Sequence, residues 1–149
     1  MRKRFQLTLT IEDFKLLMKY YFTKGLSVFN KRKLFVELNN AHIVSEGLMP
    51  LNIARQGSKV LVRNIGKNQI YRVHMIPQNS VPERSNSILM SDPLSIALLG
   101  YADGHRTEWE MPDGIQQFEL VSVRRDMEEP AFEMAGNPGR YEGEEALFV

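Results

Sequence analysis

The chain has 149 residues, of which 43% are apolar, a formal net charge of +1 and no cysteine. This length and composition suit one ordinary domain, or one domain with a small appendage, with a hydrophobic core. The lack of cysteine excludes disulfides, thiol catalysis and thiolate metal sites. No stretch approaches the roughly 20 apolar residues that cross a bilayer, and the basic start has no apolar segment behind it, so we expect a cytoplasmic protein that does not bind membranes.

The small net charge conceals two oppositely charged ends. Residues 1–45 hold nine Lys and Arg against three acids, and residues 126–149 hold one Arg against seven acids. The basic end could approach nucleic acid or an acidic protein face, and a solvated helix surface explains it equally well. The acidic end, with its prolines and glycines, predicts a flexible tail over residues 127–149, whose last four residues are apolar and could dock elsewhere.

Two helices are expected near the start of the chain. Thr10 is a good N-cap for a helix that runs to about residue 23, with an apolar face formed by Ile11, Phe14, Leu17, Met18 and Tyr21. A second helix is expected from about residue 30 to 43 or 44, with Leu34, Phe35, Leu38 and Ala41 on its apolar face. The short turn between them predicts an antiparallel helical hairpin within residues 1–47.

The rest of the ordered chain reads as a strand-rich domain over residues 48–126. Alternating apolar residues and turn signals predict five strands, at residues 59–64, 69–76, 88–90, 107–111 and 116–125. The first two and the last two should each form a hairpin. Two helices followed by strands and one short helix predict an α+β fold.

That short helix begins at a polar corner formed by Ser91, Asp92 and Pro93. The Asp92 side chain can accept a hydrogen bond from a free amide of the first turn, and Pro93 suits the first helical position. Gly100 should end the helix after about residue 99 in a left-handed conformation. The buried face should contain Leu94, Ala97 and Leu98. On local sequence alone, this is a capped helix that connects two strands.

Residues that could perform chemistry are scarce. The three histidines, His42, His74 and His105, lie on different predicted elements without metal-ligand spacing, and His42 is expected near the end of a helix. No phosphate-binding glycine loop occurs. Glu108 and Glu110 could form a carboxylate pair, but an exposed face of an edge strand explains them more simply. We therefore predict no catalytic residue, no cofactor and no metal ion.

Two aromatic residues are expected inside the fold. Trp109 and Phe118, on partner strands, should share the buried face of the sheet with Tyr71. Core packing is a simpler explanation for them than a ligand pocket.

Several motifs occur in the order seen in a known family. The corner 91–93 is followed by Ala-Leu-Leu-Gly at residues 97–100 and by Trp-Glu-Met-Pro-Asp-Gly at residues 109–114. Together with Ser-Lys-Val-Leu-Val-Arg-Asn at residues 58–64, they make residues 30–130 resemble the GreA/GreB superfamily of transcription elongation factors. Within it, the chain is most similar to the smaller, Rnk-like members.

The resemblance implies a fold and a partner. The fold would be a short antiparallel helical hairpin followed by an FKBP-like antiparallel sheet around one short helix. The partner would be RNA polymerase, which family members bind at the rim of the secondary channel. The implied partner-binding residues are Ser91, Asp92, Pro93, Asp113 and Gly114.

The chain also departs from the family pattern. Gly104 is followed by His105 where the family has Asp, and residues 112–114 read Pro-Asp-Gly where the family has Pro-Gly-Gly. Gre factors carry an acidic tip on a long coiled coil that helps to hold a catalytic magnesium ion. Here the tip, residues 24–31, has no carboxylate, although hard cations need oxygen ligands. We therefore expect a regulator that is not an enzyme, does not stimulate transcript cleavage and competes with Gre-type factors.

Two alternatives stay open. An FKBP-like fold could perform peptidyl-prolyl isomerisation, which needs an apolar pocket lined by aromatic side chains, although a fold does not fix a function. The basic hairpin could also make a weak contact with nucleic acid. This reading is ranked last because the sequence is expected to interleave few exposed aromatic and basic residues.

Overall fold

The computed structural model describes residues 6–23, 25–82 and 84–125. The predicted acidic tail and the first basic residues lie outside them. The helices are α1 (Ile11–Tyr21), α2 (Val28–Asn39) and α3 (Pro93–Leu98), with one 3-10 turn at Glu46–Leu48. The strands are β1 (Thr8–Leu9), β2 (His42–Ile43), β3 (Ser58–Asn64), β4 (Gln69–Ile76), β5 (Ser87–Leu89), β6 (Arg106–Met111) and β7 (Gly114–Arg125). No helix among these residues is long and apolar enough to cross a bilayer.

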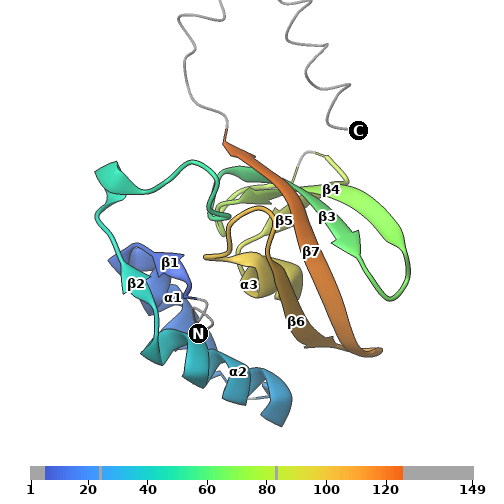
Figure 1. Ribbon diagram of the computed structural model, residues 1–149, viewed down its shortest axis with the longest axis horizontal. Coiled ribbons are helices and arrows are strands. Elements are labelled where there is room, and N and C mark those ends of the chain that lie inside the picture. The colour runs from blue at the N-terminus through green and yellow to red at the C-terminus, as the bar shows by residue number, and fades with distance from the viewer. Residues whose placement is uncertain (1–5, 24, 83, 126–149) are drawn as a thin grey trace, which may run out of the picture.

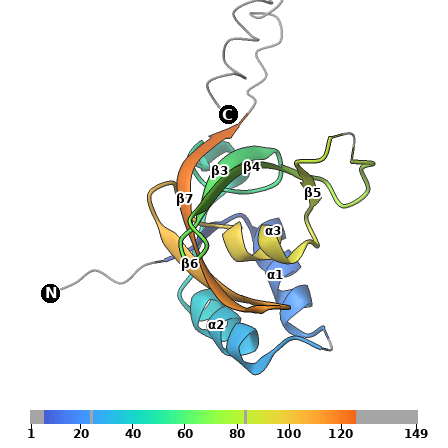
Figure 2. The ribbon, with the colours of Figure 1, turned by 90° about the vertical axis from the view of Figure 1, so that its right-hand side faces the viewer.

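Five of the strands form one curled sheet. Their order is β5-β4-β3-β7-β6, and every neighbouring pair is antiparallel except β4 and β5, which are parallel. The sheet curves around α3, as Figure 2 shows, and α2 lies beside β6 with α1 packed against α2 (Figure 1). The α+β prediction of a helical pair followed by a curled, mainly antiparallel sheet with one short helix is therefore confirmed.

The strand hairpins formed where local patterns predicted them. β3 pairs with β4 across the turn at residues 65–68, and β6 pairs with β7 across Pro112 and Asp113. In β3 the residues alternate between buried and half-buried, as expected when side chains point to opposite faces of a sheet. The parallel position of β5 was not predicted, because no local signal sets the strand beside which a three-residue segment lies.

The helical pair also formed, with different limits. Thr10 caps α1 by accepting a hydrogen bond from the amide of Asp13, as predicted. The second helix begins earlier than predicted because Ser27 caps it through the amide of Asn30. It ends at Asn39, so the prediction that it continues to residue 43 or 44 is wrong. His42 lies in β2, which pairs in parallel with β1, and not at the end of a helix.

One continuous core joins the helical pair to the sheet domain. It contains Leu17 of α1 and Leu34 of α2 together with Trp109, Phe118 and the side chains of α3. The division into residues 1–47, 48–126 and 127–149 stays a prediction; the described parts of the first two units share this core, and the third unit lies outside the described residues. Trp109 and Phe118 are buried as expected, and Tyr71, which is half-buried, packs against the same core cluster.

Three residues predicted for the apolar faces of the helices are exposed. Ile11, Met18 and Phe35 have relative exposures of 47%, 38% and 56%. The helices pack against the sheet domain as well as against each other, so the buried side of each helix is rotated away from the predicted stripe.

Gly100 follows α3 in the chain and lies against β1, the first strand. Its φ is +90°, as predicted for a left-handed helix end, and its carbonyl accepts a hydrogen bond from the amide of Thr8 at 3.1 Å. A Cβ atom at this position would lie 2.8 Å from Leu9 Cδ2 and 3.2 Å from Leu7 Cδ2. Both leucines are almost fully buried, so glycine allows β1 to lie directly against this loop.

A buried arginine links α1 to the segment that precedes β3. Arg55 is 9% exposed, its Nη2 lies 2.7 Å from Glu46 Oε1, and its Nε lies 3.6 Å from Asp13 Oδ2. Burial raises the pKa of the Asp13 carboxyl, and the Arg55 charge opposes that rise. The hydrogen bond from Arg55 lowers the pKa of Glu46.

Candidate protein-docking site

The corner at the start of α3 is exposed but held in place. Ser91 and Pro93 are exposed, while Asp92 is half-buried and its Oδ1 accepts a hydrogen bond from the amide of Leu94 at 2.9 Å. The amide of Ser91 donates to Gln78 Oε1 at 2.9 Å. Asp92 and Pro93 thus occupy the N-cap and first helical positions that the sequence predicted, and Ser91 and Pro93 face solvent in a fixed conformation.

The helix behind the corner is buried on every side. Leu94, Ala97 and Leu98 are buried as predicted, and so are Ser95 and Ile96. The Ser95 hydroxyl donates to the carbonyl of Leu89 at 2.7 Å, which ties the helix to the end of β5. A six-residue helix is not stable alone, so the core determines where the corner lies.

The other two predicted partner-binding residues, Asp113 and Gly114, lie in the turn between β6 and β7. Asp113 is exposed, and its Oδ2 lies 2.9 Å from Lys67 Nζ. The hydrogen bond from Lys67 lowers the pKa of Asp113. This turn and the corner have different hydrogen-bonding partners, so the described residues do not connect them in one network. Whether they act together stays a prediction.

Tyr20, near the end of α1, lies within electrostatic range of the corner. Burial raises the pKa of Tyr20, and the nearby Asp92 carboxylate raises it further. The Tyr20 ring also lies 6.4 Å from the Trp109 ring, measured between centroids. A partner that touches the corner would therefore also be near the helical pair.

The helical pair is fastened to the sheet domain by residues that the sequence reading overlooked. Asn30, which is 4% exposed, accepts a hydrogen bond from the amide of Glu110 at 2.8 Å and donates to its carbonyl at 3.0 Å. Lys33 Nζ lies 2.7 Å from Glu37 Oε2 and 2.9 Å from Tyr101 Oη. The Tyr101 hydroxyl in turn donates to Glu37.

These contacts shift the pKa values of two groups. Burial lowers the pKa of Lys33, and the Glu37 carboxylate opposes this effect. Burial and then the Glu37 charge raise the pKa of Tyr101 well above its ordinary value. The Lys33 amine also lies over two aromatic rings, 5.1 Å from the centroid of Tyr101 and 5.7 Å from that of Trp109. No periodic pattern could indicate this cluster, because its members come from separate parts of the chain.

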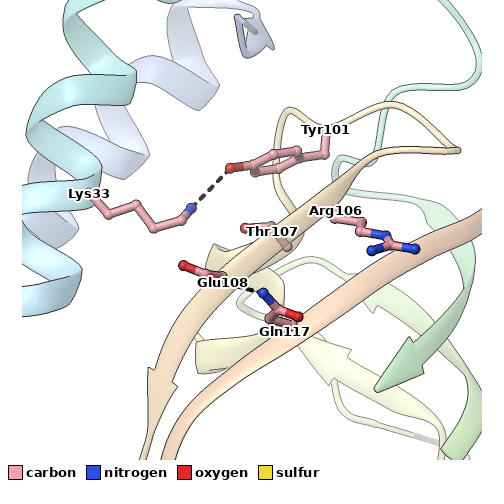
Figure 3. Close-up of a pocket in the computed structure, with 6 residues that line it drawn as sticks. All are labelled: Lys33, Tyr101, Arg106, Thr107, Glu108 and Gln117. Atoms are coloured by element: carbon pink, nitrogen blue, oxygen red, sulfur yellow. Dashed lines mark hydrogen bonds between the residues drawn. The ribbon is translucent and has the colours of Figure 1, made fainter. Parts of the chain in front are cut away.

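A pocket of about 320 Å³ opens beside this cluster (Figure 3). It is lined by Lys33, Tyr101, Arg106, Thr107, Glu108 and Gln117. The Glu108 carboxylate accepts a hydrogen bond from Gln117 Nε2 at 2.8 Å, and Lys33 is paired with Glu37. Lys33, Glu108 and Gln117 are thus already paired, and the pocket is a polar recess at the junction between the helical pair and the sheet.

The far end of the helical pair carries an exposed patch that the sequence reading missed. We call it the aromatic–basic patch; it consists of Tyr21, Phe22, Val28, Lys31, Arg32 and Phe35. The rings of Tyr21 and Phe22 meet edge to face with centroids 5.0 Å apart, and Lys31 Nζ lies 5.3 Å from the Tyr21 centroid. The expectation that exposed aromatic and basic residues are sparsely interleaved does not hold at this patch, because the fold brings together side chains that are separated in the sequence.

The isomerase alternative gains no support from the aromatic residues of the sheet. Trp109 and Phe118 are each 1% exposed. Their rings fill the core against α3, so they do not line an open pocket that could hold a prolyl peptide.

Comparisons with known proteins agree on one group of relatives. No protein-family model matches the chain. The chain is similar to transcription elongation factor GreA of Clostridium novyi, with 30% identity over 87 residues, which are 58% of this chain and 55% of that protein. It is also similar to GreA of Flavobacterium psychrophilum, with 24% identity over 103 residues, 69% of this chain and 65% of that protein. The chain thus spans a little over half the length of the first of these curated relatives and just under two thirds of the second.

A solved structure shares the fold. It is the prokaryotic transcription elongation factor GreA/GreB from Nitrosomonas europaea, which matches 81% of this chain and 99% of its own with a TM-score of 0.56. The sequence identity is 22%, so this match speaks for the fold alone.

Proposed function

We propose that the chain is a member of the GreA/GreB superfamily and acts as an RNA polymerase-binding regulator of transcription, in line with its similarity to GreA factors. It docks at the rim of the secondary channel and competes there with Gre-type factors, without stimulating transcript cleavage. Such a role would place the protein in the cytoplasm. The observation that carries the proposal is the corner at residues 91–93, which is exposed and yet rigidly held by a buried helix.

The corner is suited to docking on a large partner. Ser91 and Pro93 already have the conformation in which they would be bound, because the Asp92 cap and the buried α3 fix the backbone. A preorganised surface loses little conformational entropy on binding. The corner can therefore contribute to affinity although it is small.

The helical pair supports a role in occupying the secondary channel and not in stimulating transcript cleavage. α1 has 11 residues and α2 has 12, which correspond to roughly 17 Å and 18 Å of helix. The sequence from residue 14 to residue 36 contains no Asp or Glu. Its far end thus lacks the carboxylates that would hold a magnesium ion.

Docking through the corner can be tested by retention of the protein on immobilised core polymerase. Ser91→Arg places a bulky charge at the corner, and we expect at least a tenfold loss of affinity with unchanged stability. Asp92→Asn keeps an N-cap acceptor but removes the charge, so it separates the role of the charge from that of the cap. Val121→Arg is the control, at an exposed position on β7. Full retention of the Ser91→Arg variant would disprove docking at the corner.

The expected lack of cleavage stimulation has its own test. An arrested elongation complex with labelled RNA should keep its 3′ end when this protein is added. The protein should also slow the cleavage that a Gre factor stimulates in the same reaction. RNA shortened by this protein alone would contradict the proposal.

A weak contact between the basic hairpin and nucleic acid is a second candidate function. It is favoured by the aromatic–basic patch, where stacking and cationic side chains occur together. If it exists, the affinity for a single-stranded oligonucleotide should fall steeply with salt. Affinity that is insensitive to salt would argue against it.

A further inference from the structure

The aromatic–basic patch leaves large apolar side chains open to solvent. Phe22, Val28 and Phe35 have relative exposures of 70%, 72% and 56%. Val28 and Phe35 belong to the lining of a groove of about 370 Å³, which also contains Tyr21, Lys31 and Arg32. Adjoining exposed apolar side chains of this size mark an interaction site more often than a bare surface.

The charge around the groove is uniformly positive. Lys31 and Arg32 are exposed, and no carboxylate pairs with either of them in the part of the chain that the structure describes. Residues 14–36 contain six Lys and Arg without an acid. The groove therefore fits an occupant that carries carboxylates next to apolar side chains.

Residues 142–149 of the same chain have this composition. They read Glu-Gly-Glu-Glu-Ala-Leu-Phe-Val, three acids in a short stretch followed by four apolar residues. We propose that residues 142–149 bind the groove of the aromatic–basic patch. The carboxylates of Glu144 and Glu145 approach Lys31 and Arg32, and the side chains of residues 147 and 148 cover the apolar surface.

The connection is long enough for this contact. Figure 1 places the end of β7 and the helical pair on opposite sides of the molecule. A folded unit of about 120 residues has a radius of gyration of about 14 Å, which corresponds to a diameter of roughly 35 Å. The 17 residues that follow Arg125, up to and including Glu142, span about 56 Å when extended, at 3.3 Å per residue.

Tethering favours this occupant over a free ligand of similar chemistry. Because the segment belongs to the same chain as the groove, its effective concentration there is in the millimolar range, so a weak contact is enough to populate the bound state. A single-stranded nucleic acid also offers negative charge and stacking surfaces. It lacks the aliphatic side chains that match Val28 and the apolar floor of the groove, and it has to reach the groove from bulk solution.

The lack of cysteine makes the contact directly measurable in the full-length chain. Val28→Cys combined with Phe148→Cys places one thiol at the groove and one in the proposed occupant. Val121→Cys combined with Phe148→Cys is the matched control, with an exposed position on β7 that lies closer in sequence. In a glutathione redox buffer, we expect the intramolecular disulfide of the first pair to be at least ten times more favourable. Equal disulfide formation, or disulfide-linked dimers in place of the intramolecular product, would overturn the proposal.

A charge exchange tests the electrostatic part. Adding Lys31→Glu and Arg32→Glu to the first cysteine pair should reduce its intramolecular disulfide formation to the level of the control pair. Adding Glu144→Lys and Glu145→Lys as well should restore the difference between the two pairs. Failure to restore it would overturn the assignment of these carboxylates. Equal disulfide formation together with tight binding of a labelled oligonucleotide would overturn the proposal and assign the groove to nucleic acid. None of these measurements uses polymerase, so their outcome is separate from that of the docking proposal.

Discussion

The side chain of Asn30 pairs with the backbone of Glu110 in both directions, as a neighbouring strand would. β6 is an edge strand of the sheet, with β7 on one side only. The amide group of Asn30 thus imitates a peptide group on the open side of β6 and fixes α2 against it. Edge strands need such cover because their unpaired backbone groups invite association with other chains.

Replacing Asn30 by alanine should lower the free energy of unfolding by about 2 kcal/mol, because two partly buried hydrogen bonds are lost and the backbone of Glu110 loses its partner. Urea denaturation measures this change. Asn39→Ala is the control on the same helix: its side chain is exposed and bonds only the carbonyl of Phe35. It should change the free energy by less than about 0.5 kcal/mol. Equal changes in the free energy of unfolding would show that the Asn30 hydrogen bonds contribute no more stability than the bond made by Asn39.

Tyr101→Phe should destabilise the protein near neutral pH, because the hydroxyl bonded to Glu37 and Lys33 is lost. The folded state raises the pKa of Tyr101, so this group contributes stability that is fully present below its ordinary pKa of 10 and is lost as the pH rises above it. The advantage of wild type over the variant should therefore shrink above pH 10, by up to about 1 kcal/mol per pH unit. Urea denaturation of both chains at pH 8, 10 and 11 measures it, and an advantage that stays constant would refute the assignment.

Gly100→Ala should destabilise the fold more than Gly104→Ala. Both glycines have a φ near +90°, so each substitution carries the strain of a left-handed alanine, about 1 kcal/mol. Only at Gly100 would the new Cβ atom meet neighbours, the side chains of Leu7 and Leu9, whereas the space at Gly104 is open. The extra cost should be about 1–3 kcal/mol. Thermal unfolding compares the two variants, and similar melting temperatures would mean that β1 can move away without cost.

Arg55→Ala should cost about 3 kcal/mol, because it leaves the buried carboxylate of Asp13 without its cation. Loss of Arg55 also removes the charge that opposes the burial-induced rise in the pKa of Asp13. An acid whose pKa is raised by folding favours the folded state below its ordinary pKa, and this contribution is lost as the pH rises. The variant should therefore recover part of its stability when the pH is lowered from 7 to 5.

The double variant Asp13→Asn with Arg55→Ala supplies the check on that explanation. It has no buried charge to neutralise, so its free energy of unfolding should lack this recovery at pH 5. A gain in the free energy of unfolding of the same size at pH 5 in both variants would show that groups other than Asp13 cause it.

The parts of the fold that could be predicted from the sequence are those fixed by local chemistry. The Asp92 cap, Pro93 at the first helical position and the left-handed Gly100 each follow from the preferences of one residue. The strand hairpins follow from alternation and turn residues in the same way. These features needed no knowledge of distant contacts.

The parts that could not be predicted depend on contacts between distant segments. β1 and β2 have two residues each, too few for any periodicity, and pair across more than thirty residues. In the sequence, Asn30 and Lys33 look like ordinary polar residues on a helix surface, and their roles emerge only when β6 and Tyr101 are placed beside them. Phe35 was assigned to the buried face because periodicity identifies a stripe but not the surface it packs against.

The contact between Thr8 and Gly100 also constrains the time at which the protein can fold in the cell. Ribosomes make the chain from its amino end, so the first strand is complete when most of its surroundings do not yet exist. Leu7 and Leu9 gain the loop that covers them only after about two thirds of the chain has been synthesised. We therefore expect the two long helices to stay loosely held on the nascent chain until the loop at Gly100 has been made.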